Sequence, residues 1–313
     1  MISFRYHVFT IAAVFLAIGL GIVVGNIYVQ PGLVNNLRNQ TEALRGDLSD
    51  LRAQVGDLET RESQLQRAGD ILSLIDQGGL EGVQVAIVTH DGADDRMLAQ
   101  ARESFDTAQA DLVAVLSVTD RMGMADALAR QGLAQIVGMP AESDPAVLQR
   151  AAAALLAQRL SEGAPAPEGT SPAHDPLDEL LREQFLRFPP GLPKVSEGSL
   201  PEFGGEGLVV VVLDGGQGEL TLDPESFMVP FVEDLVRLGS TVAAGESSST
   251  EYSFVPTLRA DGPADGIRMV TVDDVDLSTG GAALVLGLER LLALGEGGNY
   301  GIKGDVQPIP PLT

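Results

Sequence analysis

The sequence predicts an α/β protein in three parts: an N-terminal transmembrane helix, a long coiled-coil stalk, and a three-layer α/β domain with a mostly parallel, flavodoxin- or Rossmann-like sheet. Three patterns predict this order: an uncharged apolar run, leucines recurring every seven residues, and β-branched runs alternating with helical patterns. We divide the 313 residues into an anchor (1–32), a stalk (33–77), an extracytoplasmic α/β domain (78–296) and a Gly/Pro-rich tail (297–313).

The apolar run covers residues 8–29 and contains no charged side chain. As a helix it would extend about 33 Å, against a bilayer core of about 30 Å. A cleaved signal peptide has a shorter apolar region and a small-residue cleavage site, and Asn26-Ile27-Tyr28 is a poor site. We therefore expect an uncleaved single-pass anchor in the plasma membrane. Arg5 is the only charge before residue 33, so the positive-inside rule places the N-terminus in the cytoplasm and residues 30–313 outside.

Small residues recur every four positions along this run and share one helix face, the arrangement of closely packed transmembrane dimers. The alternative is that small residues are simply common in such helices. The stalk that follows has leucine at five successive d positions of a heptad, and Val34, Thr41, Leu48, Val55 and Glu62 at the a positions. We expect a parallel homodimer or a coiled-coil heteropartner in the envelope; the alternative is an amphipathic helix packed on its own domain. The predicted oligomer interface is Ala13, Ala17, Gly21, Gly25, Leu37, Leu44, Leu48, Leu51, Val55, Leu58 and Leu65.

The rest of the chain alternates between strand and helix patterns, which predicts a parallel sheet of about five strands covered on both faces. The expected strands are 83–89, 112–118, 208–213, 241–244 and 267–272. The expected helices are 97–107, 120–131, 144–160, 177–188, 224–238 and 280–294, with loop insertions at 162–176 and 189–207.

Composition excludes several functions. The net charge is −24, so nucleic acid is not expected as a partner, because binding it requires Lys and Arg to displace counterions. The chain has no Cys and only three His, which excludes thiol nucleophiles and Cys metal sites and leaves little material for a Ser-His-Asp triad. No phosphate-binding glycine motif follows a strand. We therefore expect no enzymatic activity.

Acidic residues follow several expected strands, where the carboxyl ends of a parallel sheet meet. One interpretation is a site for a hard cation such as Mg²⁺ or Ca²⁺. The other, which we favour, is that these aspartates cap helices and begin turns. For copper(I), Met122 and Met124 are the only close methionine pair, and we expect them to pack in the core. The weak metal-ligand candidates are therefore His90, Asp91, Asp94, Asp95, Asp214, Met122 and Met124.

Two end motifs carry a family resemblance. The opening Met-Ile-Ser-Phe-Arg-Tyr-His, followed by residues 12–17 and glycines up to Gly25, resembles the actinobacterial family of the mycobacterial copper transport protein B, and so does the segment 271–276 with the later Gly298-Asn-Tyr-Gly301. The resemblance implies an envelope protein of copper export or tolerance in an oligomeric assembly, with copper as a possible ligand. Corynebacterial relatives imply an alternative: a non-enzymatic coiled-coil scaffold that binds a membrane partner and regulates cell separation or peptidoglycan hydrolases.

Overall fold

The structure, a computed structural model, describes residues 6–25, 44–45, 79–165, 174–216, 222–252, 254–260, 269–304 and 306–311. The chain divides into two units, residues 1–65 and residues 66–313. Most of the expected stalk, with Leu37, Leu48, Leu51, Val55, Leu58 and Leu65, lies outside the described residues. Leu44 and Arg45 are described; both have helical backbone and are exposed.

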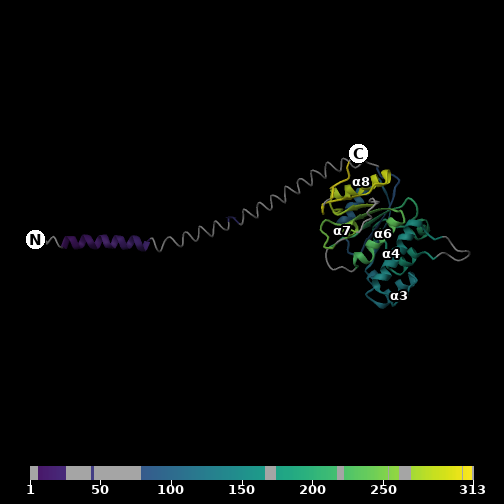
Figure 1. Ribbon diagram of the computed structural model, residues 1–313, viewed down its shortest axis with the longest axis horizontal. Helices are drawn as coiled ribbons and strands as arrows, with labels where there is room; N and C mark the ends of the chain where they lie inside the picture. The colour runs from purple at the N-terminus through teal and green to yellow at the C-terminus, as the bar shows by residue number, and fades with distance from the viewer. Residues whose placement is uncertain are drawn as a thin grey trace. The chain divides into compact units, whose positions relative to one another are not determined.

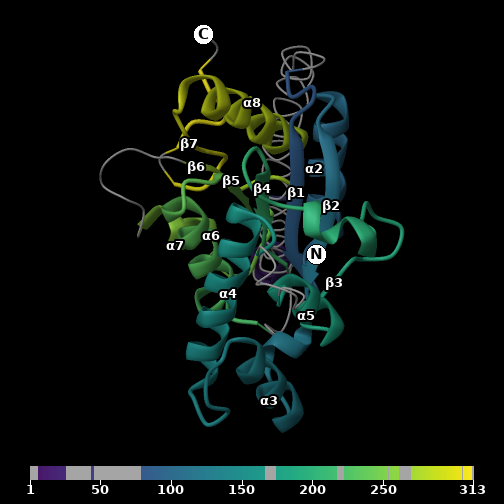
Figure 2. The ribbon, with the colours of Figure 1, turned by 90° about the vertical axis from the view of Figure 1, so that its right-hand side faces the viewer.

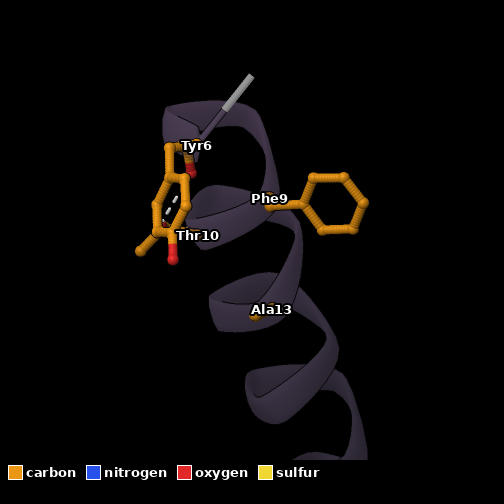
Figure 3. Close-up of a pocket in the computed structure, with 4 residues that line it drawn as sticks. All are labelled: Tyr6, Phe9, Thr10 and Ala13. Carbon is orange, nitrogen blue, oxygen red and sulfur yellow. Dashed lines mark hydrogen bonds between the residues drawn. The ribbon is translucent and has the colours of Figure 1, made fainter. Parts of the chain in front are cut away.

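The N-terminal helix, Tyr6–Gly25, is long and apolar enough to cross a membrane: its mean hydropathy is 2.6 and its apolar side chains are exposed on all sides. At 1.5 Å per residue it spans about 30 Å. Thr10 lies in the second turn of this helix, and its hydroxyl finds a partner within the helix: Thr10 Oγ1 donates to the Tyr6 carbonyl at 2.9 Å (Figure 3). The Phe9 side chain points away from both residues. A Cβ added at Gly21 or Gly25 would meet no atom, so the small-residue face is open along its length.

The second unit is built on one seven-stranded sheet in the order β3-β2-β1-β4-β5-β6-β7, which Figure 2 shows from β7 on the left to β2 on the right. All neighbours pair in parallel except β2 and β3. The parallel strands alone follow the order of flavodoxin, and the fold is therefore the expected α/β class. The strands are β1 (Gln84–His90), β2 (Asp111–Val118), β3 (Leu186–Arg187), β4 (Val209–Leu213), β5 (Thr241–Gly245), β6 (Met269–Val272) and β7 (Gly298–Tyr300).

Helices cover both faces of the sheet, because the five longer strands, β1, β2, β4, β5 and β6, carry apolar side chains on both sides; all five residues of β4 are buried. One face packs against α3, α4, α5, α6 and α7. The other packs against α2 and α8. In Figure 1, α8 lies on the opposite side of this unit from α3 and α4. The α-helices are α2 (Asp95–Thr107), α3 (Ala127–Ile136), α4 (Pro145–Glu162), α5 (Pro176–Arg182), α6 (Met228–Arg237), α7 (Val255–Ala260) and α8 (Ser278–Leu294), and the short 3₁₀ helices are η1 (Asp120–Gly123), η2 (Glu197–Glu202) and η3 (Pro224–Ser226).

The last crossover has the opposite hand from the others. The connections β4–α6–β5 and β5–α7–β6 run in one direction across the sheet with their helices on one face, and β6–α8–β7 runs in the same direction with its helix on the other face. The connection β1–α2–β2 runs across the sheet in the opposite direction, and its helix lies on the opposite face from α6 and α7. Because both the direction and the face are reversed, it has the same hand as β4–α6–β5 and β5–α7–β6. Since parallel crossovers are right-handed in about 98% of cases, β6–α8–β7 is the left-handed exception.

Several sequence-based expectations need correction. The sheet has seven strands rather than about five, because β3 and β7 are too short to leave a sequence pattern. The segment 297–313 begins with β7 and is not only a tail. The expected helix 120–131 is instead η1 and α3, separated at Met124, whose φ of +52° breaks the helix. The loop insertion 189–207 contains η2, and the short helix α7 was not expected.

Candidate functional site at the carboxyl edge of the sheet

The chain reverses its direction of progress across the sheet between β1 and β4, which are neighbours. It leaves β1 toward β2 and leaves β4 toward β5. In open α/β sheets, ligands bind beyond the carboxyl ends of the strands at this switch point. Here His90 ends β1 and Asp214 directly follows β4, so topology alone brings two of the predicted candidates together.

A hydrogen-bonded triad occupies the switch point. His90 Nε2 lies 3.0 Å from Asp214 Oδ1 and 2.8 Å from the Tyr252 hydroxyl, and that hydroxyl donates to Asp214 Oδ1 at 3.0 Å. The other ring nitrogen of His90 lies 2.7 Å from the Asp91 carbonyl. Both nitrogens therefore face acceptors, an arrangement that fits the imidazolium form.

The electrostatics of the triad follow from this geometry. Burial opposes protonation of His90, but the hydrogen bond and the charge of Asp214 outweigh it, so the pKa of His90 is raised above 6.5. Burial and then the same carboxylate raise the pKa of Tyr252, which keeps its phenol protonated. Asp214 also accepts from the Gly215 backbone N–H at 2.7 Å, and its side chain is 2% exposed. The triad is an internally satisfied network with a buried negative charge at its centre.

The aspartates that follow β1 have separate structural partners. Asp94 is the N-cap of α2: it accepts from the Arg96 N–H at 2.9 Å and from Ser247 Oγ at 2.9 Å. Asp91 accepts from Ser117 Oγ at 2.5 Å and forms a forked pair with Arg187 Nε and Nη2 at 3.0 and 2.8 Å. The capping interpretation is thus confirmed for Asp94, whereas Asp91 joins β1, β2 and β3 instead. Asp95 lies exposed in the first turn of α2.

A second acidic group follows β6. Asp273 is fully buried; it pairs with Arg259 Nη1 at 2.5 Å and accepts from the Ile302 and Lys303 backbone N–H groups at 2.7 and 3.1 Å. The neighbouring Gly301 has φ +128°, and a Cβ there would collide with the Asp273 carboxylate. The acidic motif therefore holds the C-terminal segment against the sheet.

Asp274 and Asp276 differ in how well they are satisfied. Asp276 accepts from the Ser248 N–H and hydroxyl at 2.5 and 2.7 Å. Asp274 is 1% exposed, and its Oδ1 atom has no hydrogen-bond partner in the described structure. Burial, followed by the charges of Asp273 and Asp276, raises the pKa of Asp274 to about 7.

Within the described residues, no three His, Asp or Glu side chains come together in a way that could hold a metal ion. The candidate ligands His90, Asp91, Asp94 and Asp214 do meet at one edge, but each is engaged by hydroxyl, guanidinium, phenol or backbone donors. Met122 and Met124 are buried in the core cluster on the α4 face, at 0% and 4% exposure, which confirms the expectation of core packing.

A small hollow of about 340 Å³ opens beside this edge, between α2 and the segment 189–192. His90, Asp91, Asp95 and Ser117 line it together with Thr89, whose buried hydroxyl has no hydrogen-bond partner in the described structure. The sequence reasoning missed Tyr252, Arg187 and Arg259. The sequence signal that could have pointed to this site is the polar run 247–252, which contains both Ser247 and Tyr252.

A helix long and apolar enough to cross a membrane, together with an α/β unit whose charged carboxyl edge is engaged in internal hydrogen bonds and ion pairs, defines the class: a mixed α/β protein with one N-terminal candidate membrane helix. The family model "Copper transport outer membrane protein, MctB" matches residues 1–311, and the chain belongs to this family. Proteins named Copper transporter MctB from Mycobacterium tuberculosis and Mycobacterium bovis are 27% identical to it over 314 residues, covering 96% of this chain and 96% of theirs.

Proposed function

We propose that this protein is a single-pass membrane protein of the cell envelope that takes part in copper export or copper tolerance within an oligomeric assembly. The observation that carries the proposal is the length of the family match, because residues 1–311 include the apolar helix as well as the α/β unit. The N-terminal helix supports membrane attachment, with the N-terminus in the cytoplasm by the positive-inside rule.

In this proposal copper is cargo, and the chain acts through its assembly. Copper(I) prefers thiolate and thioether ligands. The sulfur atoms of Met122 and Met124 lie in the core, shielded from solvent, and the histidine and carboxylates of the sheet edge hold one another. We therefore place the copper-related role in oligomer contacts through Ala13, Ala17, Gly21, Gly25 and the leucine heptad of the stalk.

A second candidate function is a non-enzymatic scaffold that binds a membrane partner and regulates cell separation or peptidoglycan hydrolases. The observation favouring it is the run of heptad leucines from Leu37 to Leu65 directly after the membrane helix. We expect a helical stalk between the membrane helix and the α/β domain to hold a partner protein at a fixed distance from the bilayer.

Complementation of a deletion strain separates the two functions. The strain is rescued with the wild-type chain, with a Leu48→Asn/Leu51→Asn chain, or with an Ala53→Asn chain, whose change lies at an outward heptad position. The copper role predicts that deletion lowers the copper concentration tolerated, and that only the double variant fails to restore it. Normal copper tolerance combined with chained, unseparated cells would instead favour the scaffold.

A direct titration tests the statement that copper is not held by this chain alone. Copper(I) is titrated into the full-length protein in detergent, under reducing conditions with a competing chelator. We expect no stoichiometric binding. Tight binding at one ion per chain would contradict the assembly proposal, and His90→Gln and Met122→Leu variants would then locate the site.

A further inference from the structure

A second, larger hollow of about 1170 Å³ lies between the carboxyl end of β2, the edge strand β3, α5 and the segment 194–200. Its apolar walls come from Leu181, Leu186, Phe188, Val195 and Leu200. A volume of this size is slightly above the range of about 300–1,000 Å³ that small-molecule sites in proteins usually have. Neither the switch-point triad nor the copper proposal uses it.

The charge around this hollow is the reverse of the charge of the chain. Four basic side chains line it, Arg121, Arg182, Arg187 and Lys194, against three acidic ones, Asp91, Asp120 and Asp178. The whole chain has 20 basic and 44 acidic residues. On this strongly acidic protein, the hollow therefore combines an apolar surface with a small excess of basic side chains.

Two of these cations are already neutralised and two are not. Arg187 forks onto Asp91, and Arg182 pairs with Asp178 at 2.8 Å. In the part of the chain that the structure describes, Arg121 and Lys194 form no ion pair. The Arg121 guanidinium lies 5.3 Å from the centre of the Phe185 ring, and its Nε is buried without a hydrogen-bond partner. Stacking on the ring thus fixes the position of a cation that forms no ion pair among the described residues, and the remaining acid of the hollow, Asp120, is exposed.

We infer that this hollow binds a small organic acid that has an apolar body and at least two acidic oxyanion groups. Arg121 and Lys194 supply the charges for the oxyanions, since guanidinium and ammonium groups donate strong hydrogen bonds to carboxylate, sulfonate and phosphate oxygens. The leucine and phenylalanine side chains receive the apolar body. The site is additional to the proposed function and does not depend on it.

Isothermal titration with naphthalene-1,5-disulfonate as the probe tests this inference on the full-length chain in lipid nanodiscs, with empty nanodiscs as the blank. We expect one probe per chain and weaker binding at higher ionic strength. Naphthalene-1,5-dimethanol, which keeps the apolar body and lacks the charge, should not bind. Lys194→Gln and Arg121→Gln should each weaken binding about tenfold, the usual loss for a charge-assisted hydrogen bond. Arg237→Gln, which removes an exposed arginine of α6 outside the hollow, should leave the affinity unchanged.

Lys194 is exposed, so its variant keeps the test valid even if Arg121→Gln disturbs packing on Phe185. No binding of the disulfonate would overturn the inference. Equal binding by the Lys194 variant and the wild type, or equal binding of the neutral diol, would overturn it as well, because the cations would then have no role.

Discussion

Replacing Asp274 with Asn should stabilise the protein at alkaline pH and change its stability little in acid. Asp274 is 1% exposed, its Oδ1 has no partner in the described structure, and it lies between two other aspartates. Asparagine has nearly the same shape but cannot ionise. The substitution therefore removes a buried charge and leaves the packing beside α8 in place.

The size of the effect follows from the pKa. The carboxyl ionises near 3.8 in the unfolded chain and near 7 in the folded one. Between these values the folded state binds more protons than the unfolded state, so wild-type stability falls as pH rises and levels off above pH 7. Over the whole window the cost is about 4 kcal/mol, of which about 2 kcal/mol develops between pH 5.5 and 8. For a unit of this size, that is a difference of about 4–8 °C in Tm.

The assay is thermal unfolding of the full-length chain in detergent, followed by circular dichroism at pH 5.5 and pH 8, both above the isoelectric point of about 4.3. The gain in Tm of Asp274→Asn over wild type should be larger at pH 8. Asp106→Asn, an exposed change in α2, serves as the control and should shift Tm equally at both pH values. A pH-independent effect of Asp274→Asn, or a lower Tm than wild type at pH 8, would refute the reasoning.

Three further changes have defined outcomes in the same unfolding assay. Arg159→Met should destabilise by about 3–5 kcal/mol, because the buried guanidinium now donates to part-buried Asp175 at 2.8 and 3.0 Å and to two backbone carbonyls, and all of these acceptors would lose their donor; a loss below about 1 kcal/mol would contradict this. Gly287→Ala should cost about 1–3 kcal/mol, since the new methyl would lie 2.7 Å from a β6 side chain, and an unchanged Tm would show that α8 can shift. His90→Gln should destabilise more at pH 6 than at pH 9: the raised pKa means that protonated His90, paired with Asp214, stabilises fully below about pH 6.5 and less as pH rises through the folded-state pKa. Equal losses at both pH values would argue against the imidazolium form.

The strands that are continuous apolar runs could be predicted from the sequence, and the two that are not could not. β4 is five buried residues between Leu208 and Asp214, and its bounds were predicted within one residue. β3 has two residues and exists because Leu186 pairs with Val118; β7 has three, and Tyr300 pairs with Val272. Their strand character comes from these neighbours and leaves no local period in the sequence.

The candidate site was predictable to the same extent. A parallel sheet gathers the carboxyl ends of its strands, so the meeting of His90 with Asp214 follows from recognising β1 and β4. Tyr252 is 162 residues from His90, and Arg187 is 96 residues from Asp91. Contacts over such distances depend on the tertiary fold, and neither residue belongs to a motif. The stalk interface and the absence of enzymatic activity stay predictions.

The left-handed crossover determines when, during folding, the α2 face of the sheet can be buried. Because α8 returns to the face of α2, the first and last helices of the domain share one layer, and that face of the sheet has no other helical cover among the described residues. Val85 and Ile87 of β1 are therefore fully covered only when α8, almost 200 residues later in the chain, packs on the same face of the sheet. Such separation makes folding slow, because long loops must close before their contacts contribute. A chain delivered across a membrane from its N-terminus would expose this apolar face until its last residues arrive, so loss of even the final helix should leave a sheet that aggregates.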